Sequence, residues 1–206
     1  MFNTTIATQI YAKICFEATN SQKKIIENLS EYLSDDDFSR IFVLNGFAGT
    51  GKTTLIAALV AALKELRIKP VLLAPTGRAA KRLSELSSTA ATTIHSLLKW
   101  DLETNTFLVN DKDPIQADLL IIDEFSMVDQ WLFYHLLRAC RMVKRIVVIG
   151  DEDQLPSVGC GCVLKDLIES ACFPLVRLNK IFRQSEGSDV VTLAHQIREG
   201  SADILD

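Results

Sequence analysis

The sequence predicts an α/β fold in which a parallel β-sheet is flanked by helices and carries a small inserted β-hairpin. Short apolar runs alternate with helical patterns along the chain, as is typical of strands joined by crossover helices. Each run is apolar throughout, which indicates strands that are buried on both faces. The 206 residues are 48% hydrophobic and 23% charged, an ordinary globular composition that excludes disorder and low-complexity architecture.

Five apolar runs are the expected strands, and turn residues or charges bound each of them. In chain order they are Ile41–Leu44, Val71–Leu73, Leu119–Ile122, Ile146–Ile149 and the weaker Leu175–Leu178. Helical patterns occur at Lys23–Leu33, Thr53–Leu66, Arg78–Leu86, Val128–Ala139 and 188–200. Thr19, Asn20 or Ser21 can cap the first helix, and Gly200 can end the last.

Segment 99–118 fits neither pattern, and a small inserted hairpin is expected there. Two short stretches, Leu97–Leu102 and Thr106–Val109, flank the polar residues 103–105, which suit a turn. An irregular surface loop is the alternative that the residues leave open.

Charge and composition narrow the expected location and partners. The chain has 22 basic and 26 acidic residues, so only a local basic groove could bind nucleic acid. The longest apolar run, Leu55–Leu63, is about half the roughly 18 residues of a membrane span. The first residues lack a basic n-region, so no cleavable secretory signal is expected. We therefore expect no membrane partner and a cytoplasmic location. The five cysteines lack zinc-ligand spacing and are expected to be reduced.

A phosphate-binding loop is the most specific motif in the chain. Residues Gly46–Thr53 read GFAGTGKT, which matches G-x-x-x-x-G-K-[ST] and lies between an apolar strand and a helix, as the motif requires. Glycines let backbone N–H groups surround phosphate oxygens, and the helix N-terminus attracts the same anion. Lys52 is expected to reach the β- and γ-phosphates of ATP, and the Thr53 hydroxyl to hold Mg²⁺. The expected nucleotide contacts are Gly46, Ala48, Gly49, Thr50, Gly51, Lys52, Thr53 and Thr54.

Two carboxylates follow the third predicted strand. Asp123 can complete the Mg²⁺ shell, and Glu124 can polarise the attacking water as a general base. Glu124 therefore favours hydrolysis over nucleotide binding alone. Gln154, in the loop after the fourth strand, could sense the γ-phosphate through a hydrogen bond, although a polar loop after a strand is also ordinary.

Further segments occur, with these motifs, in the order of the superfamily 1 helicase motifs. They are 74–80 (APTGRAA), Thr93-Ile94-His95, 122–127 (IDEFSM), 150–159 (GDEDQLPSVG) and Phe182-Arg183-Gln184. The chain resembles the first RecA-like motor domain of the RecD-like branch, relatives of the exodeoxyribonuclease V alpha subunit. Residues 154–168 favour that branch over the Pif1-like and relaxase-associated helicases. The resemblance implies a RecA-like P-loop NTPase and an ATP-dependent DNA helicase that translocates on single-stranded DNA from 5′ to 3′.

The resemblance also implies roles for particular residues. It makes Gln22 the adenine contact and Arg183 a γ-phosphate contact, whereas without it we would interpret them as a helix-start residue and a salt-bridge partner. Taken alone, His95 would more often be a structural histidine. The residues that the resemblance places on the path of single-stranded DNA are Thr76, Arg78, Thr93 and His95.

On this resemblance the chain divides into an N-terminal helical region (1–40), the ATPase motor domain (41–200, with the hairpin at 99–118) and the start of a linker (201–206). The expected partners are single-stranded DNA, a second RecA-like domain of the same polypeptide, and recombination or repair proteins. A first domain alone is expected to bind nucleotide weakly, to hydrolyse it slowly and not to unwind DNA. The open alternatives are a stand-alone P-loop ATPase and a regulatory ATP-binding module.

Two structural expectations follow from the family. The strand Ile146–Ile149 is expected between Ile41–Leu44 and Leu119–Ile122. In RecD-like helicases a hairpin at this position is a pin where the duplex splits, and Trp100 and Phe107 have flat faces suited to stacking. Alternatively, both aromatic residues pack inward and anchor the hairpin.

Overall fold

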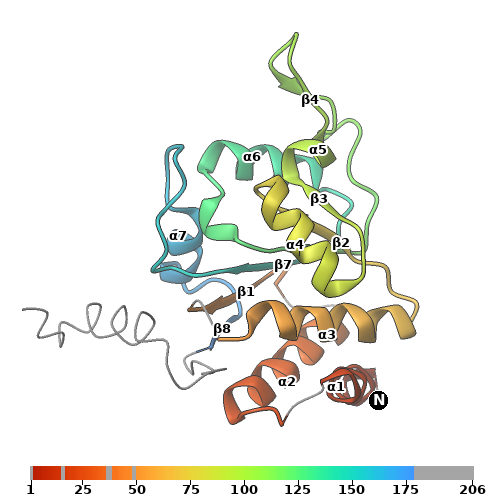
Figure 1. The fold of residues 1–206 in the computed structure, drawn as a ribbon. Coiled ribbons are helices and arrows are strands. Elements are labelled where there is room, and N and C mark those ends of the chain that lie inside the picture. The colour runs from red at the N-terminus through yellow and green to blue at the C-terminus, as the bar shows by residue number, and fades with distance from the viewer. Residues whose placement is uncertain (1, 15–16, 36–38, 48–49, 179–206) are drawn as a thin grey trace, which may run out of the picture.

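A computed structural model describes residues 2–14, 17–35, 39–47 and 50–178 of the chain. Six strands form one parallel sheet with the order β3-β2-β6-β7-β1-β8 (Figure 1). They are β1 (Ile41–Gly46), β2 (Val71–Ala74), β3 (Ala91–Thr93), β6 (Leu119–Ile122), β7 (Arg145–Gly150) and β8 (Leu175–Leu178). The predicted α/β class with a parallel sheet is confirmed.

The strand order is the expected one. β7 lies between β1 and β6, because Ile146 pairs with Ile41 on one side and with Leu120 on the other. The sequence did not predict β3, whose three residues are only half-buried and form no apolar run. This strand extends the sheet beyond β2, where Ala91 pairs with Leu72.

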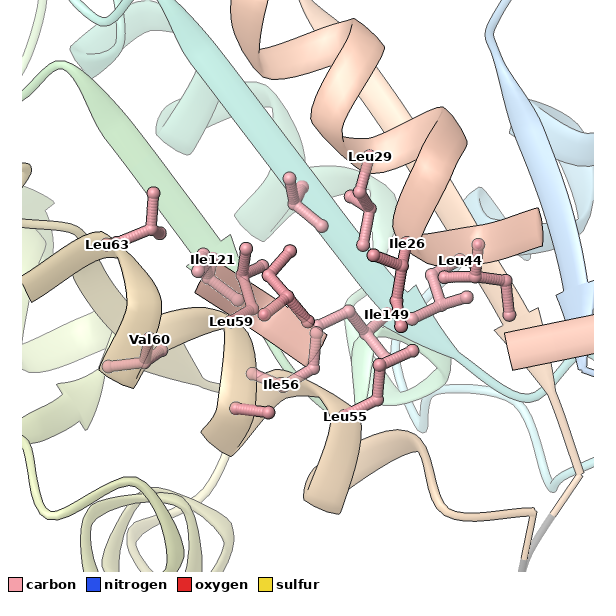
Figure 2. Close-up of a cluster of buried hydrophobic side chains, with 14 of the residues drawn as sticks. Ile26, Leu29, Leu44, Leu55, Ile56, Leu59, Val60, Leu63, Ile121 and Ile149 are labelled. Carbon is pink, nitrogen blue, oxygen red and sulfur yellow. The ribbon is translucent and has the colours of Figure 1, made fainter. Parts of the chain in front are cut away.

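Helices cover both faces of the sheet because alternate strand residues point to opposite sides. One core packs against α1 (Phe2–Lys13), α2 (Asn20–Ser34) and α3 (Lys52–Glu65), and α4 (Gly77–Ser87) adds Leu83 to it. In Figure 2 Leu59 of α3 lies beside Ile121, and Ile56 and Leu55 lie below Ile149. The other core packs against α5 (Ile94–Leu98), α6 (Gln130–Ala139) and α7 (Val163–Glu169). No helix among the described residues is long and apolar enough to cross a membrane.

Tyr32 attaches α2 to the sheet. Its buried hydroxyl lies 2.7 Å from the carbonyl oxygen of Arg40 and 3.2 Å from that of Ile146, and it accepts the Ile146 N–H at 3.1 Å. Burial raises the pKa of Tyr32 to about 12, so the phenol stays neutral and can donate. The helix that carries Gln22 is therefore fixed against the start of β7.

The inserted hairpin is present, in place of an irregular loop. β4 (Trp100–Asp101) pairs in antiparallel fashion with β5 (Thr106–Phe107), and the hairpin extends away from the sheet (Figure 1). The expectation of an extended stretch from Leu97 was wrong, because Leu97 and Leu98 belong to α5. That short helix forms because the Thr93 hydroxyl accepts the Ser96 N–H at 3.0 Å and so caps its first turn.

Candidate nucleotide-binding site

The phosphate loop and the predicted carboxylates lie where three neighbouring parallel strands end. β1 leads into the phosphate loop, Asp123 follows β6 and Asp151 follows β7. Because β7 pairs with both β1 and β6, these ends form one edge of the sheet, which we call the nucleotide edge. Crevices outside the carboxyl ends of parallel strands are the usual ligand sites of open α/β sheets.

The phosphate loop contains glycines at two positions that require them. A Cβ on Gly46 would lie 2.7 Å from the Leu178 Cβ, closer than side chains approach, and Gly51 has a φ of 86° at the start of α3. The Thr50 hydroxyl donates to the Phe47 carbonyl at 2.7 Å and so braces the loop. Ala48 and Gly49 lie outside the described residues, and Thr54 is exposed on the first turn of α3.

Lys52 is buried at the start of α3, with Thr53 beside it. Its ammonium group donates to the carbonyl oxygens of Gly46 and, at 3.0 Å, of Phe47. Burial lowers the pKa of Lys52, while the carboxylates of Asp151, Glu124 and Asp123 act in the opposite direction. The structure thus brings one cation and three carboxylates together from separate elements of the chain.

Asp123 and Glu124 occupy unusual environments. Asp123 is buried, and burial, followed by the neighbouring charge of Glu124, raises the pKa of Asp123, although the Glu124 N–H donates to its Oδ1 at 2.9 Å. Glu124 has φ 54° and ψ 39°, a left-handed backbone conformation that residues other than glycine seldom adopt. Uncommon backbone conformations are frequent at functional sites, where the surrounding structure must enforce them.

Gln154 lies in the loop after β7. Its backbone N–H donates to the Asp151 carbonyl at 3.2 Å, and its amide nitrogen lies 3.4 Å from Asp151 Oδ2. The loop borders a cavity of about 230 Å³, which Ser126 and Lys165 also line. Asp151, at the start of this loop, is buried, so the loop is not simply an ordinary solvated polar loop.

Gln22 is buried at the start of α2, with only 1% of its surface exposed. It belongs to a capping box: the Thr19 hydroxyl accepts the Gln22 N–H at 3.4 Å, and Gln22 Oε1 accepts the Thr19 N–H at 3.1 Å. Thr19 is therefore the cap among the three candidates. Since the amide oxygen holds the helix start, the amide nitrogen is the atom that could donate to a base.

The four residues predicted to line a DNA path lie after β2 and β3. Thr76 and Thr93 cap α4 and α5, and the Thr76 hydroxyl accepts the Ala79 N–H at 3.2 Å. Arg78 and His95 are exposed on the first turns of these helices. The four residues are therefore close in the fold, but capping alone accounts for the two threonines. Arg183 and the helix expected at 188–200 lie outside the described residues.

Two site residues were not recognised in the sequence. Asn45 ends the apolar part of β1, where it is 2% exposed, and Glu152 follows β7. A lone amide at the end of an apolar strand, directly before the phosphate loop, was the signal for Asn45. Glu152 had no such signal, because its contact with Asn45 spans 107 residues of sequence.

In this parallel sheet β1 leads into a phosphate loop, and carboxylates directly follow the neighbouring strands β7 and β6. That arrangement defines the P-loop NTPase class. A family model described as "AAA domain" matches residues 17–206. The chain belongs to that family, and within it the chain is a RecD-like first motor domain.

Two curated relatives support this assignment. Over 182 residues the chain is 35% identical to the ATP-dependent RecD2 DNA helicase of Deinococcus radiodurans, covering 88% of this chain and 25% of the relative. Over 185 residues it is 38% identical to the RecBCD enzyme subunit RecD of Mycolicibacterium smegmatis, covering 78% of this chain and 33% of that protein. The chain thus spans a quarter to a third of the length of these relatives.

Solved structures agree on the fold. A structure of Pif1 helicases at forked double-stranded DNA matches with a TM-score of 0.62 and 25% identity, covering 91% of this chain and 49% of that one. DnaA from Aquifex aeolicus with AMPPCP bound matches with a TM-score of 0.52 and 16% identity, covering 93% of this chain and 56% of that one. The second likeness shows the fold alone.

Proposed function

We propose that this chain is the ATP-binding and ATP-hydrolysing first motor domain of a DNA helicase that translocates on single-stranded DNA from 5′ to 3′. The observation that carries the proposal is the meeting of Lys52 with Asp123, Glu124 and Asp151 at the nucleotide edge. A module that used ATP only as a regulatory ligand would not need a carboxylate to activate water. The relatives' names support helicase activity, and the direction of movement follows from the RecD-like resemblance.

The first step is nucleotide binding. Lys52 and the N-terminus of α3 bind the phosphates, and the amide nitrogen of Gln22 donates to the adenine. Thr53 and Asp123 fit Mg²⁺, which prefers hard oxygen ligands and usually takes one or two from the protein beside phosphate oxygens and water. The buried carboxylate of Asp123, whose pKa burial raises, is a charge that a divalent cation would compensate. The cation would in turn neutralise charge on the phosphates.

The second step is hydrolysis. Glu124 accepts a proton from the attacking water, and the Gln154 amide hydrogen-bonds to the γ-phosphate. Arg183 supports the charge that develops in the transition state. The bonds of the Gln154 backbone and side chain to the buried Asp151 support a role for Gln154 in reporting γ-phosphate loss.

DNA and partner contacts complete the proposal. Arg78 and His95 bind single-stranded DNA beside the capping threonines, and a second RecA-like domain closes over the nucleotide. Recombination or repair proteins remain expected partners, since one group of relatives is named as RecBCD subunits. The cytoplasmic location also stays a prediction.

Steady-state ATP hydrolysis by the full-length protein tests the proposal. We expect turnover that single-stranded DNA stimulates, and loss of that turnover in Lys52→Ala because the phosphate loop loses its cation. The matched control is Lys64→Ala, at the other end of α3, where the exposed ammonium only donates to the Ser88 carbonyl. This control should hydrolyse ATP normally.

Three outcomes would contradict the proposal. Turnover that ignores DNA would favour a stand-alone ATPase, and ATP binding without any turnover would favour a regulatory module. Strand separation is measured on duplexes with a single-stranded extension at either end. Activity only on the 3′-extended duplex would reverse the proposed direction.

A further inference from the structure

One carboxylate joins three neighbouring strands at the nucleotide edge. Glu152 Oε1 accepts a hydrogen bond from Asn45 Nδ2 at 2.6 Å and lies 3.3 Å from an Arg177 guanidinium nitrogen. The Glu152 backbone N–H also donates to Asn45 Oδ1, at 3.1 Å. Asn45 belongs to β1 and Arg177 to β8, while Glu152 follows β7, so the contact crosses strands that are distant in sequence.

The strand register places this contact at the base of the phosphate loop. Asn45 pairs with Gly150 of β7 on one side and with Arg177 of β8 on the other. The three residues form one row across the sheet, and the next residue of β1 is Gly46, where the phosphate loop begins. The Asn45–Glu152 contact therefore links the loop after β7 to the strand that leads into the phosphate loop.

The two interactions of Glu152 differ in strength. Asn45 is 2% exposed, so its amide must be bonded within the protein, and a hydrogen bond to an ionised carboxylate is stronger than a neutral one. The Arg177 side chain is 43% exposed, and water weakens an ion pair of that kind. We therefore expect the Asn45 interaction to dominate and the Arg177 interaction to modulate it.

The position of Glu152 connects this row to the groups proposed to contact the γ-phosphate. Glu152 lies between Asp151, whose charge acts on Lys52, and the loop residue Gln154. On the other side, β8 ends at Leu178, which packs against Gly46, and Arg183 follows five residues later in the sequence. The Gln154 loop thus leaves the sheet beside the row that Glu152 holds.

We propose that Glu152 is a positioning residue for recognition of the γ-phosphate. Its carboxylate, bonded to Asn45 and paired with Arg177, holds the Gln154 loop and β8 in fixed positions relative to the phosphate loop. The inference rests on the proposed ATPase function and deepens it, because the helicase resemblance assigns no role to Asn45, Glu152 or Arg177.

A comparison of two nucleotides isolates this role. ADP contacts the phosphate loop but has no γ-phosphate, whereas AMPPCP carries one and resists hydrolysis. In the full-length Glu152→Ala variant we expect unchanged ADP affinity and about tenfold weaker AMPPCP binding, the effect of one charge-assisted hydrogen bond. The turnover number for ATP should fall as well. Isothermal titration calorimetry measures both affinities.

Three further variants make the test sharper. Glu152→Gln keeps an acceptor for the Asn45 amide and should recover most of the AMPPCP affinity, while Asn45→Ala should behave as Glu152→Ala does. Arg177→Met should show the smallest loss. The matched control is Glu169→Ala, which removes an exposed carboxylate paired only with Lys165 within α7.

The outcomes separate this inference from the proposed function. Equal losses of ADP and AMPPCP affinity would overturn the inference, because they would show a general role in shaping the phosphate loop. Unchanged AMPPCP affinity in Glu152→Ala and Asn45→Ala would overturn it too. If the unmodified protein binds neither nucleotide, the proposed function itself fails, and the inference fails with it. Selective AMPPCP losses beside an active unmodified protein would support both.

Discussion

The nucleotide edge contains buried charged side chains, whereas the inserted hairpin is held by contacts between aromatic rings. At the edge, Lys52 and Asp123 are buried charged groups whose pKa values burial shifts toward the neutral forms. In the hairpin, Phe107 is 5% exposed, and its ring centroid lies between 4.8 and 5.7 Å from the ring centroids of its aromatic neighbours. These neighbours are His95, Trp100, Trp131 and His135.

The difference shows which residues packing explains. Buried aromatic side chains in mutual contact are stable as they stand, so Phe107 needs no ligand to account for it. Buried charges lower stability unless something compensates them, so the nucleotide edge does call for a ligand. Phe107 therefore fits the interpretation that the aromatic residues anchor the hairpin. Trp100 is only half-buried, and the residues in the turn of the hairpin are exposed. If the hairpin is a pin, the turn is therefore the part that we expect to contact DNA.

The largest expected effect is on stability, from removal of the hairpin's anchor. Phe107→Ala leaves a cavity among the surrounding rings and should lower the free energy of unfolding by about 3 kcal/mol. The conservative Phe107→Leu should cost about 1 kcal/mol, because it keeps most of the apolar volume. Chemical denaturation measures both. Equal stabilities of Phe107→Ala and the unmodified protein would mean that the cluster does not anchor the hairpin.

A smaller change in the free energy of unfolding, an increase, is expected from a substitution at the nucleotide edge. Since burial raises the pKa of Asp123, the protonated form favours folding, and that contribution is lost as the pH rises through the raised pKa. In Mg²⁺-free buffer at pH 7, Asp123→Asn should therefore unfold at higher denaturant concentration than the unmodified protein.

The pH dependence sharpens this test. The gain of Asp123→Asn should shrink as the pH falls below the ordinary aspartate pKa of about 4, where the carboxyl is protonated in both states. The control Asp118→Asn changes an exposed carboxylate that pairs with Lys144 and should show no such gain. Destabilisation by Asp123→Asn at pH 7 would show that the buried charge is already compensated.

The smallest effect is expected at the tip of the hairpin. Leu102 is 80% exposed in the turn, where an apolar side chain gains nothing from packing. If the tip contacts the duplex junction, Leu102→Ser should slow strand separation several-fold, which is the effect of losing one contact with a base. DNA-stimulated ATP hydrolysis should stay unchanged. Normal unwinding by Leu102→Ser would remove the tip from the pin hypothesis.

The sequence was informative where structure depends on local pattern. Continuous apolar runs identified the central strands, and the phosphate-loop motif located Lys52, because both signals lie within a few residues. The strand β3 was missed because its half-buried residues read Ala-Thr-Thr, and α7 because it has only seven residues. Short elements such as these depend on the sheet beside them.

Contacts between distant segments could not be predicted in the same way. The bond between Asn45 and Glu152 exists only because β1 and β7 are neighbours, and the burial of Asp151 follows from the same pairing. Gln22 was assigned by resemblance, but its bond to Thr19 is a local capping box that the Thr-x-x-Gln spacing at 19–22 could have indicated. The motifs therefore predicted which residues belong to the candidate site, whereas the contacts of Asn45, Glu152 and Asp151 depend on the pairing of β1 with β7.

The measurement that tests the central claim most directly compares binding with turnover in Glu124→Gln. The substitution keeps the size of the side chain and removes the base, so the full-length variant should bind ATP with normal affinity and hydrolyse it at least a hundredfold more slowly. Nucleotide affinity is measured by calorimetry and turnover by phosphate release, both with saturating single-stranded DNA. Normal turnover in Glu124→Gln would contradict the account, because the nucleotide edge would then lack its proposed general base.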